Sequence, residues 1–332
     1  MNSRSTIYIC CASAVILFLV GTLVGSRYER SKFLGFFSQI HSIRNAEQGY
    51  RYTAPFLGTD SPPATDIGVF TGLRSQIVDT AIAAEQKHEL TDYGVYFQSL
   101  TSTFWFGINE DENFLPASLY KVPLALIVYK EIEDGVLSAQ TRLMYTEAID
   151  KENPAGATQT SLTVGASYTV QELLARMLVE SDNGAKNLLG TTLNNSYVTT
   201  FWTLMNLGSP HPDEEIAARD YSFFFRVLYN STYLNADDSE TILGMMASST
   251  YANALVSGVP SGVKVSHKWG LSNNPAAGAA TQGEIELHDC GIVYAPSDPY
   301  ILCIMTKGYD QQALNAFIAQ VSKIVYNGST TD

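Results

Sequence analysis

The sequence has few cysteines and histidines, and neither residue type is clustered. It contains four cysteines and five histidines among 332 residues, with no C-x-x-C pair. Metal centres and redox dithiols need such ligands at close spacing, so we predict no metal and no cofactor. Cys10 and Cys11 lie in an N-terminal apolar run, whereas Cys290 and Cys303 fall in two successive strand-like segments. The second pair can meet across a hairpin, but we favour two buried free thiols.

Positive charge is also scarce. The chain has 20 lysines and arginines against 33 aspartates and glutamates, and its net charge is −13. Nucleic-acid binding needs a basic surface, so the composition argues against a nucleic-acid partner. The sequence has no internal repeat or long low-complexity tract, and 45% of its residues are hydrophobic. A sizeable globular core is therefore expected, while the oligomeric state stays open.

One segment near the N-terminus lacks charge altogether. No charged side chain occurs from residue 5 to residue 26, and the apolar stretch covers residues 7–24. A run of about 18 residues is near the minimum that spans a bilayer and longer than the apolar region of a usual signal peptide. We predict that residues 1–26 are a transmembrane anchor, with a cleaved signal segment as the alternative. The basic residues that follow favour the opposite orientation to the one proposed below; they are Arg27, Arg30 and Lys32.

The rest of the chain divides into a linker and one domain. Residues 27–65 begin basic and end in a loop-like Ser/Pro/Thr stretch, which indicates a juxtamembrane linker. The domain of residues 66–328 contains periodic segments whose order is helix, two strands, several helices, three strands and a helix. The expected helices cover residues 73–88, 117–134, 170–179, 220–228, 238–246 and 310–326, and the expected strands cover 93–98, 103–108, 263–269, 285–294 and 300–306.

This order predicts an α+β fold. The strands would form one five-stranded antiparallel sheet, flanked by the N-terminal and C-terminal helices of the domain. The middle helices would form an all-helical lobe, with the functional site between lobe and sheet. Thr169 is a good N-cap, and Glu172 completes a capping box with it. His267 and His288 are isolated on strand patterns, and we interpret both as structural.

Three short strings carry the chemistry. They are Ser118-Leu119-Tyr120-Lys121, Ser181-Asp182-Asn183 and Lys268-Trp269-Gly270, in that order. A serine hydroxyl is a weak nucleophile until a neighbour accepts its proton, and a lysine can do so when burial lowers its pKa. Ser118 and Lys121 would project from one face of a helix start, where backbone N–H groups favour a developing oxyanion. Each string alone is weak, because S-x-x-K occurs by chance about once in such a chain.

Taken together, the strings resemble those of class A β-lactamases and penicillin-binding proteins, which carry S-x-x-K, S-D-N and K-T-G. The resemblance covers residues 66–327 and implies a β-lactamase/transpeptidase-like fold. It implies that Ser118 is the nucleophile, that Lys121 activates it, and that Ser181 relays a proton to the leaving group. Substrate binding would involve Asn183, Lys268, Trp269, Gly270 and the backbone N–H of Leu271, which would join that of Ser118 as an oxyanion hole.

Three departures from this superfamily bear on function. Trp269 replaces a threonine or serine whose hydroxyl would bind the substrate carboxylate. No glutamate between Leu207 and Asp220 is followed four residues later by asparagine, the pattern that positions the deacylating water in class A β-lactamases. No arginine occurs after Arg226, so Lys268 would have to bind a carboxylate with Lys264 or Ser266. In addition, Pro123 would strain the helix beside the nucleophile.

The leading hypothesis is a membrane-anchored serine hydrolase with its domain outside the cytoplasm. Resemblance implies β-lactam or D-Ala-D-Ala-type amide substrates, an acyl-enzyme on Ser118 and slow deacylation. The alternative is a non-catalytic module of the same fold that binds cell-wall peptide, and Trp269 is its best support. A serine-dependent glutaminase of this fold is a third option, but an N-terminal span does not suit an enzyme of a free cytoplasmic amino acid.

Overall fold

The computed structural model describes most of the predicted domain and little of what precedes it. The described residues are 42–44, 50–53, 56–59, 70–102, 104–152, 160–207, 214–272 and 283–330. The predicted anchor lies outside them. Across these described ranges, no helix is both long enough and apolar enough to cross a membrane.

Five strands form one antiparallel sheet in the order β4–β3–β11–β10–β9. The strands are β3 (Asp92–Ser99), β4 (Trp105–Ile108), β9 (Val265–Ser272), β10 (Ile285–Val293) and β11 (Tyr300–Gly308). The central strand β11 is buried on both faces, since Leu302 and Ile304 join one core while Cys303 and Met305 join the other. β9 is an edge strand, which leaves one side of its backbone free for other partners.

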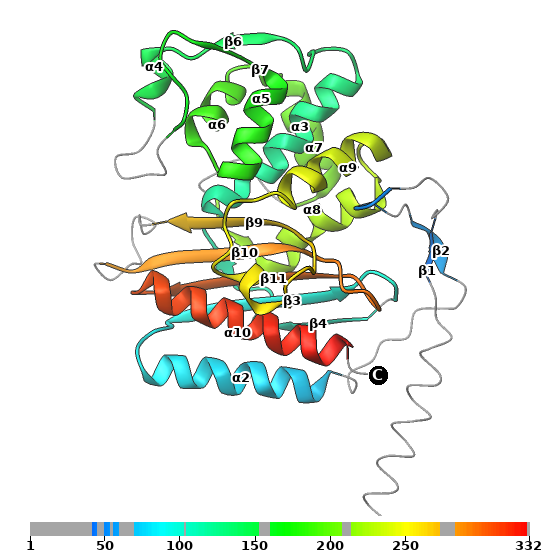
Figure 1. Ribbon diagram of the computed structural model, residues 1–332, viewed down its shortest axis with the longest axis vertical. Coiled ribbons are helices and arrows are strands. Elements are labelled where there is room, and N and C mark those ends of the chain that lie inside the picture. Colours follow the sequence, from blue (N-terminus) through cyan, green and yellow to red (C-terminus); the bar gives the residue numbers. More distant parts are fainter. Residues whose placement is uncertain are drawn as a thin grey trace, which may run out of the picture.

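Helices from the two ends of the domain cover one face of the sheet, and the middle of the chain covers the other (Figure 1). α2 (Thr71–Gln86) and α10 (Gln311–Thr330) pack on the first face. The opposite face carries the helical lobe. Its elements are α3 (Lys121–Glu133), α4 (Glu147–Asp150), α5 (Val170–Ala175), α6 (Asn183–Gly190), α7 (Asn195–Met205), α8 (Ala218–Asn230) and α9 (Ala236–Met246). The α+β architecture predicted from the sequence is confirmed.

Short elements complete the fold. β5 (Asn113–Phe114) pairs with β8 (Ile216–Ala217), β6 (Arg142–Met144) with β7 (Ser167–Thr169), and β1 (Ser42–Arg44) with β2 (Phe56–Thr59). Three further helical turns are η1 (Ala117–Tyr120), η2 (Arg176–Glu180) and η3 (Leu255–Gly258). The capping box of Thr169 and Glu172 is confirmed at the start of α5. Helix α7 was not predicted from the sequence.

The central helix of the lobe is α3, and its residues Val122–Tyr129 are all buried. A helix that is apolar on every side suits such a position. Pro123 lies in the first turn of α3 rather than in its second turn, because residues 117–120 form the separate turn η1. Its missing N–H would have met the carbonyl of Leu119, and Tyr221 donates its hydroxyl to that carbonyl at 2.9 Å. The predicted strain at Pro123 is therefore wrong.

The end of the predicted linker contacts the lobe. The carboxylate of Glu240, on α9, accepts the backbone N–H groups of Arg51, Tyr52 and Thr53 at 2.7–2.8 Å. The Tyr52 ring also contacts that of Tyr294 edge to face. These contacts fix the segment that precedes the domain against α9.

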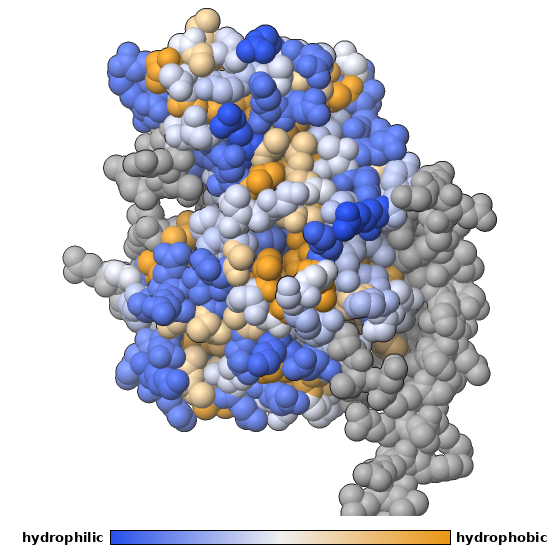
Figure 2. All heavy atoms as spheres, in the orientation of Figure 1, coloured by the Kyte–Doolittle hydropathy of each residue, from blue (hydrophilic) through white to orange (hydrophobic). Residues whose placement is uncertain are grey.

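On the face drawn in Figure 2, hydrophilic residues cover much of the lobe and of the outer helices, and apolar residues are interspersed among them. The exposed large apolar side chains are spread along the sequence: Ile82, Trp105, Val136, Met144, Val164, Leu204 and Tyr309. Apolar residues exposed singly in this way are normal for a soluble domain surface.

Candidate active site

Ser118 lies in the turn η1, immediately before α3. Its side chain is only partly buried, so a substrate can reach it. The preceding residue, Ala117, has a left-handed backbone with φ of +48°. For a residue with a side chain this conformation costs about 1–2 kcal/mol, and such strain often occurs at functional positions.

Lys121 is buried with its ammonium beside Ser118. Its Nζ lies 2.9 Å from Oγ of Ser118, 3.1 Å from Oγ of Ser181 and 2.7 Å from Oδ1 of Asn183. It also donates to the carbonyl of Ser181 at 2.5 Å. Burial, together with the charges of Lys268 and Lys186, holds the pKa of Lys121 well below its usual value. A neutral amine has a free lone pair and can accept the proton of the Ser118 hydroxyl.

The second string forms a tight junction between two helical segments. Ser181 ends η2 in the left-handed conformation, and Asp182 is the N-cap of α6. Asp182 points inward: its carboxylate accepts the N–H groups of Ala185 and Ser161 at 2.9 and 2.7 Å. Burial would raise the pKa of Asp182, but these hydrogen bonds outweigh it and the pKa is lowered. The charged carboxylate therefore fixes the loop that carries Ser181 and Asn183.

The third string brings a second buried lysine to the same serine. Lys268, on β9, donates from Nζ to Oγ of Ser181 at 2.9 Å and to the carbonyl of Trp269 at 2.8 Å. Burial lowers the pKa of Lys268 to about 7, although Asp289 on β10 acts to raise it. Ser181 thus lies between two amines, one of which also contacts Ser118.

The edge of β9 passes directly beside the nucleophile. A Cβ atom on Gly270 would lie 2.9 Å from the carbonyl of Pro116 and 3.1 Å from the backbone nitrogen of Ser118, so only glycine fits. The N–H of Tyr294 bonds to the carbonyl of Lys264, and bonded pairs alternate along an antiparallel ladder. With the unbroken register of β9 and β10, the N–H of Leu271 points to the free edge. It lies on the side where the predicted oxyanion hole requires it.

Trp269 is packed away from the face of β9 that carries Lys268. Its indole stacks on the ring of Tyr251, with centroids 4.0 Å apart and planes within 13°. Tyr251 in turn donates its hydroxyl to Asn315 of α10 at 2.6 Å. The indole remains 5.3 Å from Nζ of Lys268. The sequence alone gave no signal for this stack, because Tyr251 and Trp269 are joined only by the fold.

A buried histidine–carboxylate pair joins β9 to the neighbouring strand β10. Nδ1 of His267 lies 2.7 Å from Oδ1 of Asp289, and Oδ2 of Asp289 accepts the N–H of Leu255. His288 lies 2.9 Å from the carbonyl of Leu115 and accepts the N–H of Thr306. Both histidines are fully buried and hydrogen-bonded, which agrees with the predicted structural roles.

Within the described ranges, no group of three or more potential metal ligands occurs.

The two side chains suggested as partners of Lys268 do not reach the site. Ser266 is buried and donates its hydroxyl to the carbonyl of Leu243 at 2.8 Å. Lys264 directly precedes β9 and lies four residues before Lys268, so the Cα atoms of the two lysines are about 13 Å apart at the usual rise of a strand. The expectation that Ser266 or Lys264 shares carboxylate binding with Lys268 is therefore wrong.

Two glutamates lie near the position in the sequence where a deacylating base is expected. They line a small pocket. Glu214 and Glu215 border a cavity of about 120 Å³ together with Pro116 and Tyr120. Ser118 is not among the residues that line this cavity. Residues 208–213, which precede the glutamates, lie outside the described part of the chain.

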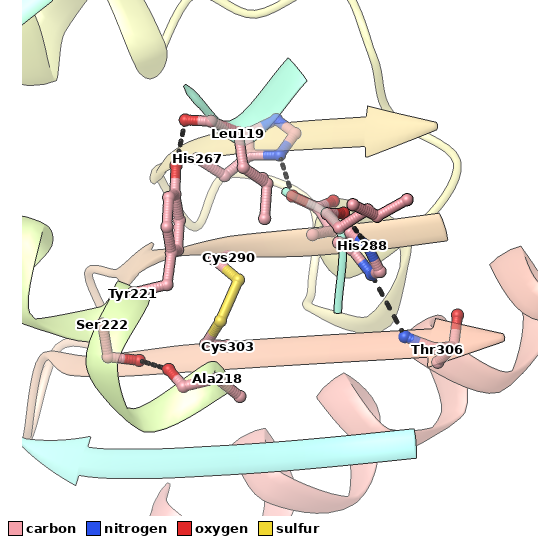
Figure 3. Close-up of a disulfide and its surroundings, with 11 residues drawn as sticks. Leu119, Ala218, Tyr221, Ser222, His267, His288, Cys290, Cys303 and Thr306 are labelled. Carbon is pink, nitrogen blue, oxygen red and sulfur yellow. Dashed lines mark hydrogen bonds and ion pairs between the residues drawn. A yellow bond between two sulfur atoms is a disulfide. The ribbon is translucent and has the colours of Figure 1, made fainter. Parts of the chain in front are cut away.

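Cys290 and Cys303 form a disulfide between β10 and β11 (Figure 3). The two residues are direct partners in the register of the strands and both are buried. The prediction of two free thiols is therefore wrong. The sequence pattern placed the cysteines on adjacent strands, but only the register shows that they lie opposite each other.

Comparisons with known proteins identify relatives by sequence. The VEB-1 β-lactamase of Pseudomonas aeruginosa is 23% identical over 243 residues, which are 66% of this chain and 79% of the relative. A β-lactamase of Streptomyces lavendulae is 24% identical over 265 residues, which are 73% and 83% of the two chains.

Solved structures share the fold. PBP-A superposes with a TM-score of 0.67 at 23% identity, covering 81% of this chain and 98% of that one. A variant of PBP-A, solved as an acyl-enzyme complex with penicillin G, gives a TM-score of 0.66 at 23% identity, covering 81% and 99%. At the level of sequence, the model of the β-lactamase enzyme family matches residues 73–328. Because this match spans more than half of the sequence, the chain belongs to the β-lactamase enzyme family.

Proposed function

We propose that the protein is a serine hydrolase that forms an acyl-enzyme on Ser118 with β-lactams or D-Ala-D-Ala-type amides and releases it slowly. One observation carries the proposal. A single buried amine, Nζ of Lys121, lies within hydrogen-bond distance of both Ser118 and Ser181, and Ser181 also contacts Lys268. This chain of contacts connects a nucleophile, a base and a proton relay.

Acylation would use these groups in order. Neutral Lys121 accepts the proton of Ser118 while Oγ forms a bond to the substrate carbonyl carbon. The backbone N–H groups of Ser118 and Leu271 stabilise the oxyanion. As the oxyanion collapses, the C–N bond breaks, and Ser181 donates its proton to the leaving nitrogen. Lys121 returns its proton to Ser181, so the amine is neutral again in the acyl-enzyme.

We expect slow deacylation because no glutamate between Leu207 and Asp220 matches the pattern that positions the deacylating water in class A β-lactamases. A hydrolytic water needs a positioned base within hydrogen-bond reach, and a lost general base typically costs a factor of about 10² to 10⁴ in rate. Glu214 and Glu215, the glutamates in the segment where class A β-lactamases carry this base, border a pocket that Ser118 does not line. The acyl-enzyme solved for the PBP-A variant supports the idea that this fold can hold such an adduct.

The location of the protein is part of the proposal. We infer that residues 1–26 hold it at the cell membrane and that the domain lies outside the cytoplasm. The disulfide of Cys290 and Cys303 supports this location, because disulfides persist in oxidising compartments. Cell-wall peptides and β-lactams are also met outside the cytoplasm.

The rival function is a non-catalytic module that binds cell-wall peptide. The indole of Trp269, which replaces a hydroxyl, favours it. The two functions differ in whether a covalent bond forms. A binding module would retain cell-wall peptide and would not react with any acylating probe.

Labelling with a fluorescent penicillin and with a fluorophosphonate tests the proposal. The wild type should be labelled, and Ser118→Ala should abolish labelling because it removes the hydroxyl that attacks the probe. Ser138→Ala is the matched control, since Ser138 is an exposed serine outside the site. Labelling of Ser118→Ala at the wild-type level would contradict the acyl-enzyme, and an unlabelled wild type would favour the binding module.

A further inference from the structure

The corner of the site formed by Lys268 and Trp269 has lost the hydroxyl with which related enzymes hold a substrate carboxylate. Trp269 occupies this position and offers only an indole N–H as a polar group. The nearest upstream hydroxyl on β9 does not replace it. The hydroxyl of Ser266, the closest one upstream on β9, is buried and donates to Leu243.

The indole is held in place from the side of α10. It stacks face to face on Tyr251 at 4.0 Å, and the Tyr251 hydroxyl bonds to Asn315. Trp269 also packs against the core between the sheet and α10. Stacking and core contacts therefore fix the indole in a position 5.3 Å from Nζ of Lys268, where it is an apolar neighbour of that cation.

The cation at this corner is already engaged. Lys268 is 1% exposed, and its Nζ donates to the Ser181 hydroxyl and to the Trp269 carbonyl. At most one of its N–H groups is left for a substrate. No arginine follows Arg226 in the sequence, so no guanidinium from β9 to β11 can add a bidentate contact. The net charge of −13 gives no general attraction for anions.

We propose that this corner selects acyl donors whose leaving group carries no free carboxylate, such as an internal peptide bond or an amidated peptide end. The inference rests on the proposed acylation of Ser118 and narrows its substrates, because the D-Ala that leaves a D-Ala-D-Ala-type amide carries a free carboxylate and is disfavoured here. Trp269, held by Tyr251, is the residue that determines this specificity. An uncharged carboxamide or ester beside the leaving nitrogen packs against the indole, whereas a carboxylate would lose its water there without a matching partner.

The test compares benzylpenicillin with its methyl ester, two donors that share the same lactam and differ only in the carboxylate. The second-order rate of acylation is measured for each by intact mass. In the wild type, the ester should react at least as fast as the free acid. In Trp269→Thr the free acid should gain at least about tenfold over the ester, since a hydrogen bond to a charged group changes an equilibrium by about that factor or more.

The ratio of the two rates is taken within one variant, so a change in the folded fraction cancels. Trp105→Thr is the matched control, because Trp105 is exposed on the distant edge strand β4, and it should keep the wild-type ratio. A wild type that acylates faster with the free acid than with the ester would overturn the inference, as would an unchanged ratio in Trp269→Thr. In both cases acylation itself would stand. Failure of both donors and of a fluorophosphonate to react with Ser118 would overturn the proposed function as well.

Discussion

The residues that set the chemistry are two buried lysines, and burial is the main cause of their lowered pKa values. Lys121 also feels the charges of Lys268 and Lys186, while Asp182 acts in the opposite direction. Burying an amine destabilises the fold, because water is lost around the charge. The same burial makes the amine a base at neutral pH, so part of the stability of the domain is given up for reactivity at Ser118.

The rate of Ser118 acylation should therefore depend on the protonation of Lys121. Because the neutral amine is the base, the rate with benzylpenicillin rises with pH through the pKa of Lys121 and then levels off. Lys186→Met removes a nearby positive charge, raises the pKa of Lys121 and moves the inflection to higher pH. The pH–rate profile of acylation measures this shift. Lys130→Met is the control, since Lys130 pairs with Glu133 and Asp134, and an equal shift there would contradict the assignment.

Lys268 should make the domain more stable as the pH rises. Its pKa is about 7 in the folded protein and 10.5 as a free side chain. Between these values the unfolded chain binds more protons, so the free energy of unfolding rises by up to about 1.4 kcal/mol per pH unit. Urea unfolding at pH 7.5, 8.5 and 9.5, with ~0.3 kcal/mol precision, should show this rise, and Lys268→Met should reduce it. An identical slope in the variant would show that Lys268 keeps an ordinary pKa.

At the scale of elements, a helix from a distant part of the sequence supplies a hydrogen bond that the start of α3 lacks. Pro123 cannot donate to the carbonyl of Leu119, and Tyr221 of α8 supplies the missing hydrogen bond. This hydrogen bond joins the turn η1, which carries Ser118, to helix α8, which packs on the sheet. The strain predicted from the sequence was wrong because the sequence pattern cannot show a donor a hundred residues away.

A double-mutant cycle tests this connection. Tyr221→Phe should cost about 1–3 kcal/mol of unfolding free energy, because it removes the hydroxyl that donates to a buried carbonyl. In the Pro123→Ala background the same substitution should cost less, since the N–H of the new alanine can bond to the carbonyl of Leu119. Denaturant unfolding of the four proteins gives the coupling energy. Equal costs in both backgrounds would mean that Tyr221 and Pro123 are independent.

Elements with strong local signals were predictable and those that depend on register or on distant partners were not. Thr169 and Glu172 identified the start of α5, and the five strands followed from their apolar patterns. The disulfide depends on Cys290 lying opposite Cys303, and the Trp269–Tyr251 stack depends on the loop after α9 reaching β9. The distance of Lys264 from the site was likewise misjudged. The number of residues between two positions on a strand gives their separation, but it shows which of them lies in the site only when the position of the site is known.

At the scale of the whole molecule, the site lies where the helical lobe meets the edge of the sheet. η1 and η2 belong to the lobe, and β9 belongs to the sheet, so Ser118, Ser181 and Lys268 come together only when both halves are packed. The bonds of Glu240 to residues 51–53 then join this unit to the segment that follows the predicted anchor.

The anchored topology predicts access from outside. Protease added to intact cells should digest the domain, and the protein from such cells should gain two alkylatable thiols only after reduction, because Cys290 and Cys303 are bridged. A cytoplasmic protein with an epitope of similar size is the control for leakage. A domain that is protected until the cells are lysed would show that the basic residues after the apolar run had been the better guide.

The central claim is that Ser118 forms a covalent and long-lived acyl-enzyme. The most direct test follows the intact mass of the full-length protein, held in detergent, over minutes after mixing with benzylpenicillin. We expect a single added benzylpenicillin that persists over this time in the wild type and is absent in Ser118→Ala. An unchanged mass with every acylating probe, or an adduct that also forms in Ser118→Ala, would contradict the acyl-enzyme. An adduct cleared within seconds would contradict slow deacylation, and its trapping by Glu214→Gln or Glu215→Gln would identify the missing base.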